Sequence, residues 1–154
     1  MNMTLLYDSR EKKNSHILKF FEKNNISIKK EILGFGDYSF LIDDENYKNK
    51  IVIERKHSLD EFAINCTAKR KQFIAEMERA KKSNAKFILL LENSSLENIK
   101  QHKYRSRMHP NSMIGSLKAW KERYDIKVFF LKSEWYSGKA ILFFFQEYYS
   151  QNML

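Results

Sequence analysis

Residues 50–61 read KIVIERKHSLDE, and this stretch decides how the rest of the chain is interpreted. Its start, Lys50–Ile53, is a short run of β-branched apolar residues typical of a buried strand. Its end, residues 58–61 (SLDE), is a capping box that predicts a helix with Ser58 as the N-cap. A buried strand therefore ends in Glu-Arg-Lys and turns almost at once into a helix.

The side chains at the end of this strand are charged. Alternate residues of a strand share a face, so Glu54 and Lys56 point the same way while Arg55 points the other way. A carboxylate and an ammonium at the end of a buried strand are costly to desolvate. Such a cost is usually accepted only for a tight ion pair or for chemistry.

The bulk composition predicts one folded domain, spanning residues 1–154. The chain is 43% hydrophobic and 14% aromatic, so it can form a core, and its one Pro and four Gly leave no candidate linker. A chain of this length buries about two-thirds of its unfolded surface. The formal charge of +9 makes a polyanion the first partner to consider, although charge alone is weak evidence.

Several classes of protein are disfavoured. Cys66 is the single cysteine, which excludes an internal disulfide and a Cys-rich zinc site. The four histidines have no metal-ligand spacing such as HExxH. No signal peptide is apparent, and the longest apolar run, Ala140–Phe145, is far too short to cross a bilayer. We therefore expect a soluble, intracellular protein.

Strand and helix patterns alternate along the chain. Strands are expected at residues 3–7, 26–33, 39–42, 50–56, 86–91 and 127–131, with a polar hairpin loop at 43–49. Helices are expected from Asn14 or Ser15 to about residue 24, from Leu59 with an irregularity near Thr67, at 96–99, from Asn111 or Ser112, and from Ser133 or Glu134 to about Tyr149. This alternation predicts an α/β fold with a mixed central sheet and helices on both faces.

Acidic residues gather where the predicted strands end. They are Asp8, Glu11, Asp37, Glu54 and Asp60. Each has a simple structural interpretation taken alone: Asp8 and Asp37 suit turns, and Asp60 in the first turn of a helix meets the helix dipole favourably. The functional interpretation depends on all of them occurring around one strand end.

These residues resemble a known signature. Gly36-Asp37-Tyr38 followed by Glu54-Arg55-Lys56-x-x-x-Asp60 is similar to the G-D-x…E-R-K-x-x-x-D signature of the XPF-type structure-specific endonuclease domain, a branch of the restriction-endonuclease-like PD-(D/E)xK nucleases. Residues 7–11 (YDSRE) look like the D-x-R-E of that family, and Arg70 looks like its arginine in the following helix. The chain has Lys69 where the family commonly has Gly.

The resemblance implies a restriction-endonuclease-like fold and a metal-dependent phosphodiesterase. Mg²⁺ prefers hard oxygen ligands from one or two carboxylates plus water and phosphate, and Mn²⁺ is expected to substitute. The expected metal ligands are Asp37, Glu54, the backbone carbonyl of Arg55, and Asp8 directly or through water. Lys56 is expected to position the attacking water and stabilise negative charge. Glu11, Arg55 and Asp60 are expected to support these groups, with Asp60 orienting Arg55 or Lys56.

DNA-binding residues are expected in two basic segments and beside Asp8. The first segment is Lys69, Arg70 and Lys71, with Arg70 the leading phosphate contact; a solvated basic face is the alternative for the two lysines. The second contains Lys103, Tyr104, Arg105 and Arg107, which suit backbone contact and stacking on an unpaired base, or form an ordinary surface loop. Arg10 in the D-x-R-E segment is the remaining candidate.

Aromatic residues near the C-terminus exceed what one helix needs for its own core. They are Trp135, Tyr136, Phe143, Phe144, Phe145, Tyr148 and Tyr149. We interpret them as core plus a dimer surface. The resemblance implies the same, because nuclease domains of this family pair through helices that flank the sheet.

The sequence thus predicts a Mg²⁺-dependent endonuclease that cuts branched or flapped DNA as a homodimer. One alternative is a non-cleaving DNA-binding partner subunit, which the presence of the acids and Lys56 disfavours. A second is a duplex-cutting nuclease of restriction or recombination type. A third, an RNA-binding module, has only charge and aromatic content in its favour.

Overall fold

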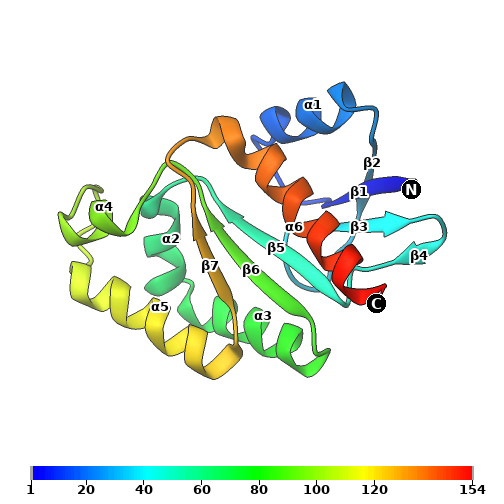
Figure 1. The fold of residues 1–154 in the computed structure, drawn as a ribbon. Helices are drawn as coiled ribbons and strands as arrows, with labels where there is room; N and C mark the ends of the chain where they lie inside the picture. Colours follow the sequence, from blue (N-terminus) through cyan, green and yellow to red (C-terminus); the bar gives the residue numbers. More distant parts are fainter. Residues whose placement is uncertain (1, 154) are drawn as a thin grey trace.

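The computed structural model describes residues 2–153 (Figure 1). The elements are, in order, β1 (Met3–Asp8), α1 (Ser15–Lys23), β2 (Ser27–Glu31), β3 (Tyr38–Ile42), β4 (Glu45–Asn46), β5 (Ile51–Lys56), α2 (Leu59–Cys66), α3 (Arg70–Lys82), β6 (Lys86–Leu91), α4 (Leu96–Lys100), α5 (Pro110–Tyr124), β7 (Lys127–Phe130), the 3-10 turn η1 (Glu134–Tyr136) and α6 (Ser137–Asn152).

The strands form one mixed sheet in the order β2-β1-β3-β5-β6-β7, with β4 added beside β3. The pairs β1–β2, β5–β6 and β6–β7 are parallel, whereas β3 runs antiparallel to both β1 and β5. The central strand β5 is therefore enclosed on both edges. This arrangement confirms the predicted α/β fold with a mixed sheet.

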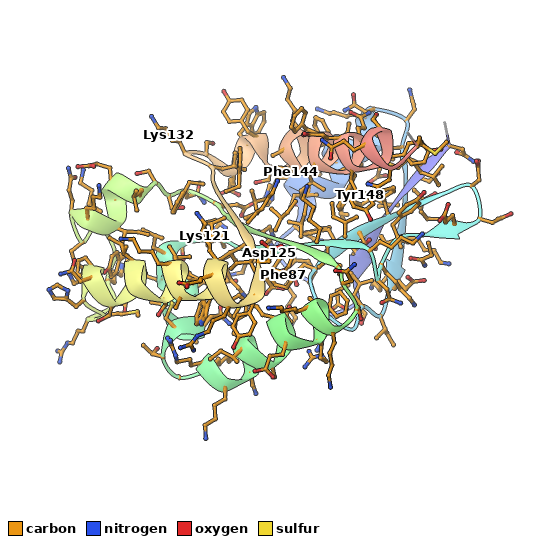
Figure 2. All side chains as sticks on the ribbon, turned by 60° about the horizontal axis from the view of Figure 1, so that its bottom comes forward. Phe87, Lys121, Asp125, Lys132, Phe144 and Tyr148 are labelled. Atoms are coloured by element: carbon orange, nitrogen blue, oxygen red, sulfur yellow. The ribbon has the colours of Figure 1, made fainter. Side chains whose placement is uncertain are left out.

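The two faces of the sheet carry separate cores. Helices α2, α3 and α5 pack on one face around Phe62, Phe73 and Trp120, and α1 and α6 pack on the other face around Phe21 and Phe145. In Figure 2, Phe87 of β6 lies on the side of α3 and α5, and Phe144 and Tyr148 lie along α6. Both cores are aromatic, which explains much of the high aromatic content.

Strand β5 divides its side chains between these two cores. Val52 belongs to the core under α2, α3 and α5, while Ile51 and Ile53 belong to the core under α1 and α6. By the alternation of a strand, Glu54 and Lys56 continue the face of Val52, and Arg55 continues the face of Ile53. The strand thus directs the Glu54 carboxylate and the Lys56 ammonium to one layer of the fold and the Arg55 guanidinium to the other.

Most predicted element starts agree with the structure within a residue or two. The Ser58 cap is confirmed, since its Oγ accepts the N–H of Glu61 at 3.2 Å. The irregularity near Thr67 is a complete break between α2 and α3. The hairpin loop at 43–49 contains the short strand β4, whose following residue Tyr47 stacks on Phe40.

Three elements differ from the prediction in where they begin or end. Strand β2 ends at Glu31, and Ile32 is 76% exposed because the chain turns there so that the Leu33 N–H reaches Asp8. Helix α5 begins at Pro110 rather than at 111 or 112, because the His109 ring caps it by accepting the Asn111 N–H and proline is well suited to a first turn. The last helix is preceded by η1 and extends to Asn152.

Candidate active site

Glu54 and Lys56 form a close ion pair at the end of β5. Lys56 Nζ lies 2.8 Å from Glu54 Oε2, and the two side chains are 11% and 6% exposed. The ammonium also lies 5.5 Å from the centre of the Phe73 ring of α3. Burial by itself would lower the pKa of Lys56, but the carboxylates of Glu54 and Asp37 outweigh it and raise that pKa above its usual range. Lys56 is therefore held as a cation.

Asp37 is fixed between β1 and β5 by its own backbone and side chain. Its N–H donates to Ile53 O at 2.8 Å, and its carbonyl accepts the Asp8 N–H at 2.8 Å. Its Oδ2 accepts the backbone N–H of Arg55 at 2.7 Å. Burial and then the negative charges of Glu54 and Glu11 raise the pKa of Asp37 well above its usual value. The single positive charge of Lys56 therefore does not balance the negative charges of the carboxylates around Asp37.

Gly36 is required for this placement. Its φ is +76°, a conformation that L side chains rarely adopt, and a Cβ there would lie 2.5 Å from the Cβ of Val52. Any side chain at this position would push the turn away from β5. The Gly-Asp pair of the sequence signature is thus a requirement of packing as well as of charge.

Arg55 points to the opposite layer, as predicted, and is enclosed by oxygen atoms. Its Nε donates to Glu11 Oε2 at 2.7 Å, and its two terminal nitrogens donate to Glu92 Oε1 at 2.8 Å and to the Lys12 carbonyl at 2.7 Å. Burial opposes the charged form, but Glu11 outweighs it, so the pKa of Arg55 lies above its usual range. Arg55 anchors β5 and the segment after β1 to each other.

Glu92 is the fully buried centre of this second network, and the sequence analysis did not assign it a role. Besides Arg55, its carboxylate binds the His16 Nε2 of α1 at 2.9 Å and accepts the Ser137 hydroxyl of α6. Burial would raise the pKa of Glu92, but Arg55 and then Ser137 and His16 lower it below its usual value. One ionised carboxylate thus joins β5, α1 and α6.

Asp8 is also buried, but its side chain is occupied by the protein. Oδ1 accepts the Leu33 N–H at 2.9 Å, and Oδ2 accepts both the backbone N–H and the Nε of Arg10. Burial would raise the pKa of Asp8, yet the hydrogen bonds from Leu33 and Arg10 lower it overall. In the structure, the Asp8 side chain fixes the turn at Leu33 that precedes Asp37. A metal contact from Asp8 stays a prediction.

Glu76 of α3 joins the site, and the sequence analysis missed it. Its Oε2 accepts the N–H of Gly36 at 2.9 Å. Burial, and then the charge of the neighbouring Glu54, raise the pKa of Glu76 to about 9. A signal was present: Glu76 lies three residues after Phe73 and four before Ala80, both buried, so an acid falls on the apolar side of the helix.

The oxygen atoms at this strand end suit a divalent cation of the Mg²⁺ type. Asp37 and Glu54 offer carboxylates, and the Arg55 carbonyl shares the edge of β5 that faces Asp37, because the Ile53 carbonyl two residues earlier accepts the Asp37 N–H. Among residues 2–153, no three His, Cys, Asp or Glu side chains are already gathered as a metal cage. Mg²⁺ does not need one, since it commonly binds one or two carboxylates and keeps several waters.

Asp60 makes its side-chain hydrogen bonds to a distant loop and not to Arg55 or Lys56, and the orienting role predicted for it stays a prediction. Its Oδ1 accepts the backbone N–H groups of Arg105 and Ser106, both at 2.8 Å. The carboxylate is thus bonded to the basic loop before α5, which lies 45 residues away in sequence. Asp60 lies in the first turn of α2, where its side chain also reaches the loop at residues 105–106.

The first basic segment divides in the structure. Arg70 packs between helices: its guanidinium donates to Ser116 Oγ at 2.9 Å and to the Cys66 carbonyl at 3.1 Å, and lies 4.9 Å from the Trp120 ring centre. Lys69 and Lys71 are exposed beside it. A phosphate contact from Arg70 stays a prediction, and its observed role is to join α2, α3 and α5.

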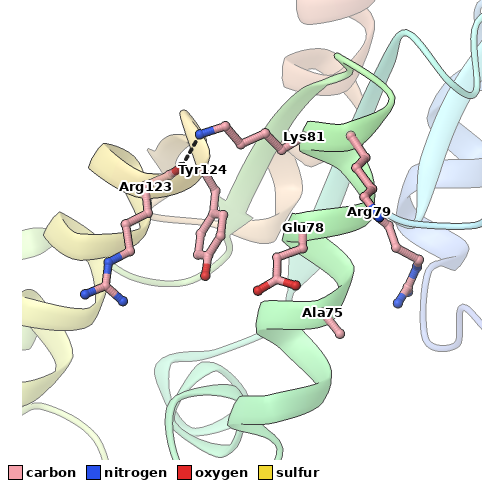
Figure 3. Close-up of a pocket in the computed structure, with 7 residues that line it drawn as sticks. Ala75, Glu78, Arg79, Lys81, Arg123 and Tyr124 are labelled. Carbon is pink, nitrogen blue, oxygen red and sulfur yellow. Dashed lines mark hydrogen bonds between the residues drawn. The ribbon is translucent and has the colours of Figure 1, made fainter.

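A pocket of about 480 Å³ lies between α3 and α5, away from these acids (Figure 3). It is lined by Ala75, Glu78, Arg79, Lys81, Lys82, Arg123 and Tyr124. Lys81 Nζ donates to the Arg123 carbonyl at 2.5 Å across its rim, as the dashed line shows. None of the predicted site residues lines this pocket, so the candidate active site is the end of β5 and not this hollow.

Comparison with known proteins identifies the family. The model of the ERCC4 domain matches residues 7–144, which includes every residue of the acidic cluster. The chain belongs to the ERCC4 domain family. The resemblance to XPF-type nuclease domains that the signature indicated is thereby confirmed. No sequence among curated proteins matches it closely.

Solved structures show that this ERCC4 domain has the XPF-like fold. XPF from Aeropyrum pernix superposes with a TM-score of 0.68 at 17% identity, covering 93% of this chain and 60% of the XPF chain. XPF from Aeropyrum pernix in complex with DNA superposes with a TM-score of 0.71 at 18% identity, covering 96% of this chain and 66% of the other. The ERCC4 domain described here therefore spans less than two-thirds of the XPF chains that it matches.

ERCC4 domains typically belong to divalent-metal-dependent nucleases that process DNA, and the oxygen donors described above agree with such a metal. In the described part of this ERCC4 domain, no helix is long and apolar enough to cross a membrane.

Proposed function

We propose that this chain is a metal-dependent endonuclease that hydrolyses phosphodiester bonds in branched or flapped DNA. The observation that carries the proposal is the convergence of Asp37, Glu54 and Lys56 at one strand end, with the Glu54–Lys56 contact at 2.8 Å. A degenerate partner subunit would not need a buried Lys-Glu pair beside a second carboxylate of raised pKa. The basic charge of +9 agrees with a polyanionic substrate.

The protein groups divide the work as follows. Asp37 and Glu54, with the Arg55 carbonyl, would hold Mg²⁺ or Mn²⁺. The cation, when bound, supplies Lewis-acid stabilisation of the scissile phosphate and lowers the pKa of a water. Lys56, held protonated, donates hydrogen bonds to the attacking water and to the phosphoryl oxygens as negative charge develops on them.

Three further carboxylates, Glu11, Glu76 and Glu92, keep this geometry in place. Glu11 and Glu92 bind the Arg55 side chain, and this fixes the Arg55 N–H that donates to Asp37. Glu76 holds the Gly36 N–H and thereby the turn that presents Asp37. The catalytic groups therefore sit on rigid elements with each supporting contact supplied by a different part of the chain.

We also propose that the protein acts as a homodimer through the edge of the sheet at β7 and α6. Phe129, Tyr136 and Phe143 are 40%, 57% and 59% exposed, and they line a hollow of about 270 Å³ together with Leu131, Lys139, Ala140 and Phe144. Because β7 is an edge strand, its apolar side chains would favour association unless covered. A second copy presents the same surface, as a two-fold interface requires.

The substrate class is tested with a panel of labelled DNAs. Flap, fork, four-way junction and plain duplex of equal length are incubated with Mg²⁺ or Mn²⁺, beside an Asp37→Ala/Glu54→Ala variant. Faster cutting of the branched substrates, lost in the variant, supports the proposal. Equal cutting of plain duplex favours a restriction or recombination type of nuclease, and binding without any cutting favours a partner subunit.

A further inference from the structure

The carboxylate of Asp60 connects the catalytic strand to a basic loop. Asp60 lies in the first turn of α2, four residues after Lys56, and its Oδ1 accepts the N–H groups of Arg105 and Ser106 at 2.8 Å each. One oxygen atom of Asp60 thus accepts two neighbouring backbone amides of the same loop. The loop at residues 101–109, which connects α4 to α5 in Figure 1, is therefore fixed at the start of α2.

Hydrogen bonds and ring stacking hold this loop in a defined conformation. The Lys103 N–H donates to the Asn98 carbonyl at 2.8 Å, and the Tyr104 hydroxyl donates to the Met108 carbonyl at 2.8 Å. The His102 ring stacks on Tyr104 with centroids 4.3 Å apart. Tyr104 and Met108 pack against the core under α2, α3 and α5. These contacts occupy Tyr104, so the predicted stacking on a base is not the role that its surroundings favour.

Inward and outward side chains alternate along the same loop. Tyr104, Ser106 and Met108 are partly buried, whereas Lys103, Arg105 and Arg107 are exposed. The alternation turns three cations within five residues toward solvent from a backbone that is held at its centre by Asp60. Loops that carry cations without such support lose more conformational entropy on binding.

We propose that Asp60 is a positioning residue, which latches the basic loop to the catalytic strand–helix turn so that Lys103, Arg105 and Arg107 grip the DNA backbone next to the scissile phosphate. This inference rests on the proposed nuclease function for its substrate. It assigns the last acid of the E-R-K-x-x-x-D signature to substrate positioning through backbone amides, and not to the metal or to Lys56.

The latch depends on an oxygen acceptor more than on charge, and this separates it from a metal-binding role. Asp60→Asn keeps a carbonyl oxygen at the same place, and Asp60→Ala removes it. Binding of a labelled flap is measured by fluorescence anisotropy in EDTA, where no cutting occurs, as a function of salt. Asp44→Ala, which removes an exposed aspartate of the β3–β4 turn, is the matched control.

We expect Asp60→Ala to weaken DNA binding about tenfold. The slope of log K against log salt concentration should become shallower by the amount that corresponds to roughly two to three lost phosphate contacts. Asp60→Asn should stay within about threefold of the parent protein. Amide hydrogen exchange at Arg105 and Ser106 should accelerate in Asp60→Ala and stay slow in Asp60→Asn. The triple Lys103→Ala/Arg105→Ala/Arg107→Ala variant should weaken DNA binding as much as Asp60→Ala does. Adding Asp60→Ala to the triple variant should not lower the affinity further.

Two results would overturn the proposal. Faster exchange in Asp60→Ala with unchanged affinity and salt slope would show a latch that does not serve DNA. Equal loss in Asp60→Asn and Asp60→Ala would show that charge is what matters. Because these measurements need no cleavage, a chain that binds DNA through the latch but cuts nothing would refute the nuclease and leave the latch standing.

Discussion

Glu76 Oε2 accepts the N–H of Gly36 at 2.9 Å, and so a helix far along the chain holds the turn that presents Asp37. This contact brings another carboxyl group beside Glu54. Burial and neighbouring acids raise the pKa values of both Asp37 and Glu76.

Replacing Glu76 by Gln should change how stability depends on pH. The pKa of Glu76 is about 9 in the folded protein against 4.5 ordinarily, so the folded state keeps a proton that the unfolded chain loses. The stabilisation from this proton is complete below about pH 4.5 and is lost as the pH rises toward 9. Glu76→Gln has no such loss, and in EDTA we expect it to gain at least about 1 kcal/mol over the parent at pH 8, because one pKa unit corresponds to about 1.4 kcal/mol.

The measurement is urea unfolding between pH 5 and 9, with Glu78→Gln on the exposed side of α3 as the control. Parallel stability curves for Glu76→Gln and the parent protein across this range would contradict the assigned pKa.

Removing the Lys56 ammonium should impair catalysis with little effect on DNA binding. The pKa of Lys56 is raised, so it acts as a fixed cation, and loss of one such donor typically costs about 10²–10³ in rate. Single-turnover cleavage and anisotropy in EDTA measure the two effects separately. Lys50→Ala, which breaks the exposed pair with Glu45, serves as the control. A Lys56→Ala variant that binds DNA poorly but cuts at the parent rate would assign Lys56 to binding.

Arg55→Met should destabilise the whole fold. The change leaves Glu11 and Glu92 without their cation, and Glu92 is fully buried. Removal of one partner from a buried ion pair costs about 3–5 kcal/mol. Urea unfolding of Arg55→Met measures this cost, and Arg10→Met, which removes an exposed cation paired with Asp8, provides a comparison. A loss below about 1 kcal/mol would show that the network contributes little to folding.

The edge surface of β7 and α6 should govern association. Sedimentation velocity should show the parent protein at twice the mass of a single chain. Phe143→Ser should raise the dimer dissociation constant roughly 30-fold or more, because this exposed aromatic lies in the proposed interface. Ile32→Ser removes an exposed apolar side chain beside the opposite edge strand β2 and should leave the dimer intact. A monomeric parent protein at high concentration would contradict the dimer.

The parts of the site that the sequence could predict are those with a local signature. The strand at Ile51–Lys56, the Ser58 cap and the opposite directions of Arg55 and its two neighbours follow from strand alternation and capping alone. They needed no knowledge of what packs against β5.

The contacts that the sequence could not supply join distant segments. Glu76 meets Gly36, Asp60 meets Arg105, and Glu92 joins Arg55 to α1 and α6. Each depends on how helices cross the sheet, which periodicity does not specify. Arg70 shows the converse: the sequence predicts a phosphate contact for it, which stays a prediction, but its place over the Trp120 ring arises from tertiary packing that periodicity does not specify.

Metal-dependent hydrolysis itself is the central claim, and the most direct measurement is a cleavage time course on a labelled flap with Mg²⁺, with EDTA, and with an Asp37→Asn/Glu54→Gln variant in Mg²⁺. These two substitutions keep the shape of each side chain and remove the charge that would hold the cation. We predict cutting by the parent protein in Mg²⁺ only, and none by the variant although it still binds the flap. Cutting in EDTA, or equal cutting by the variant, would contradict the account.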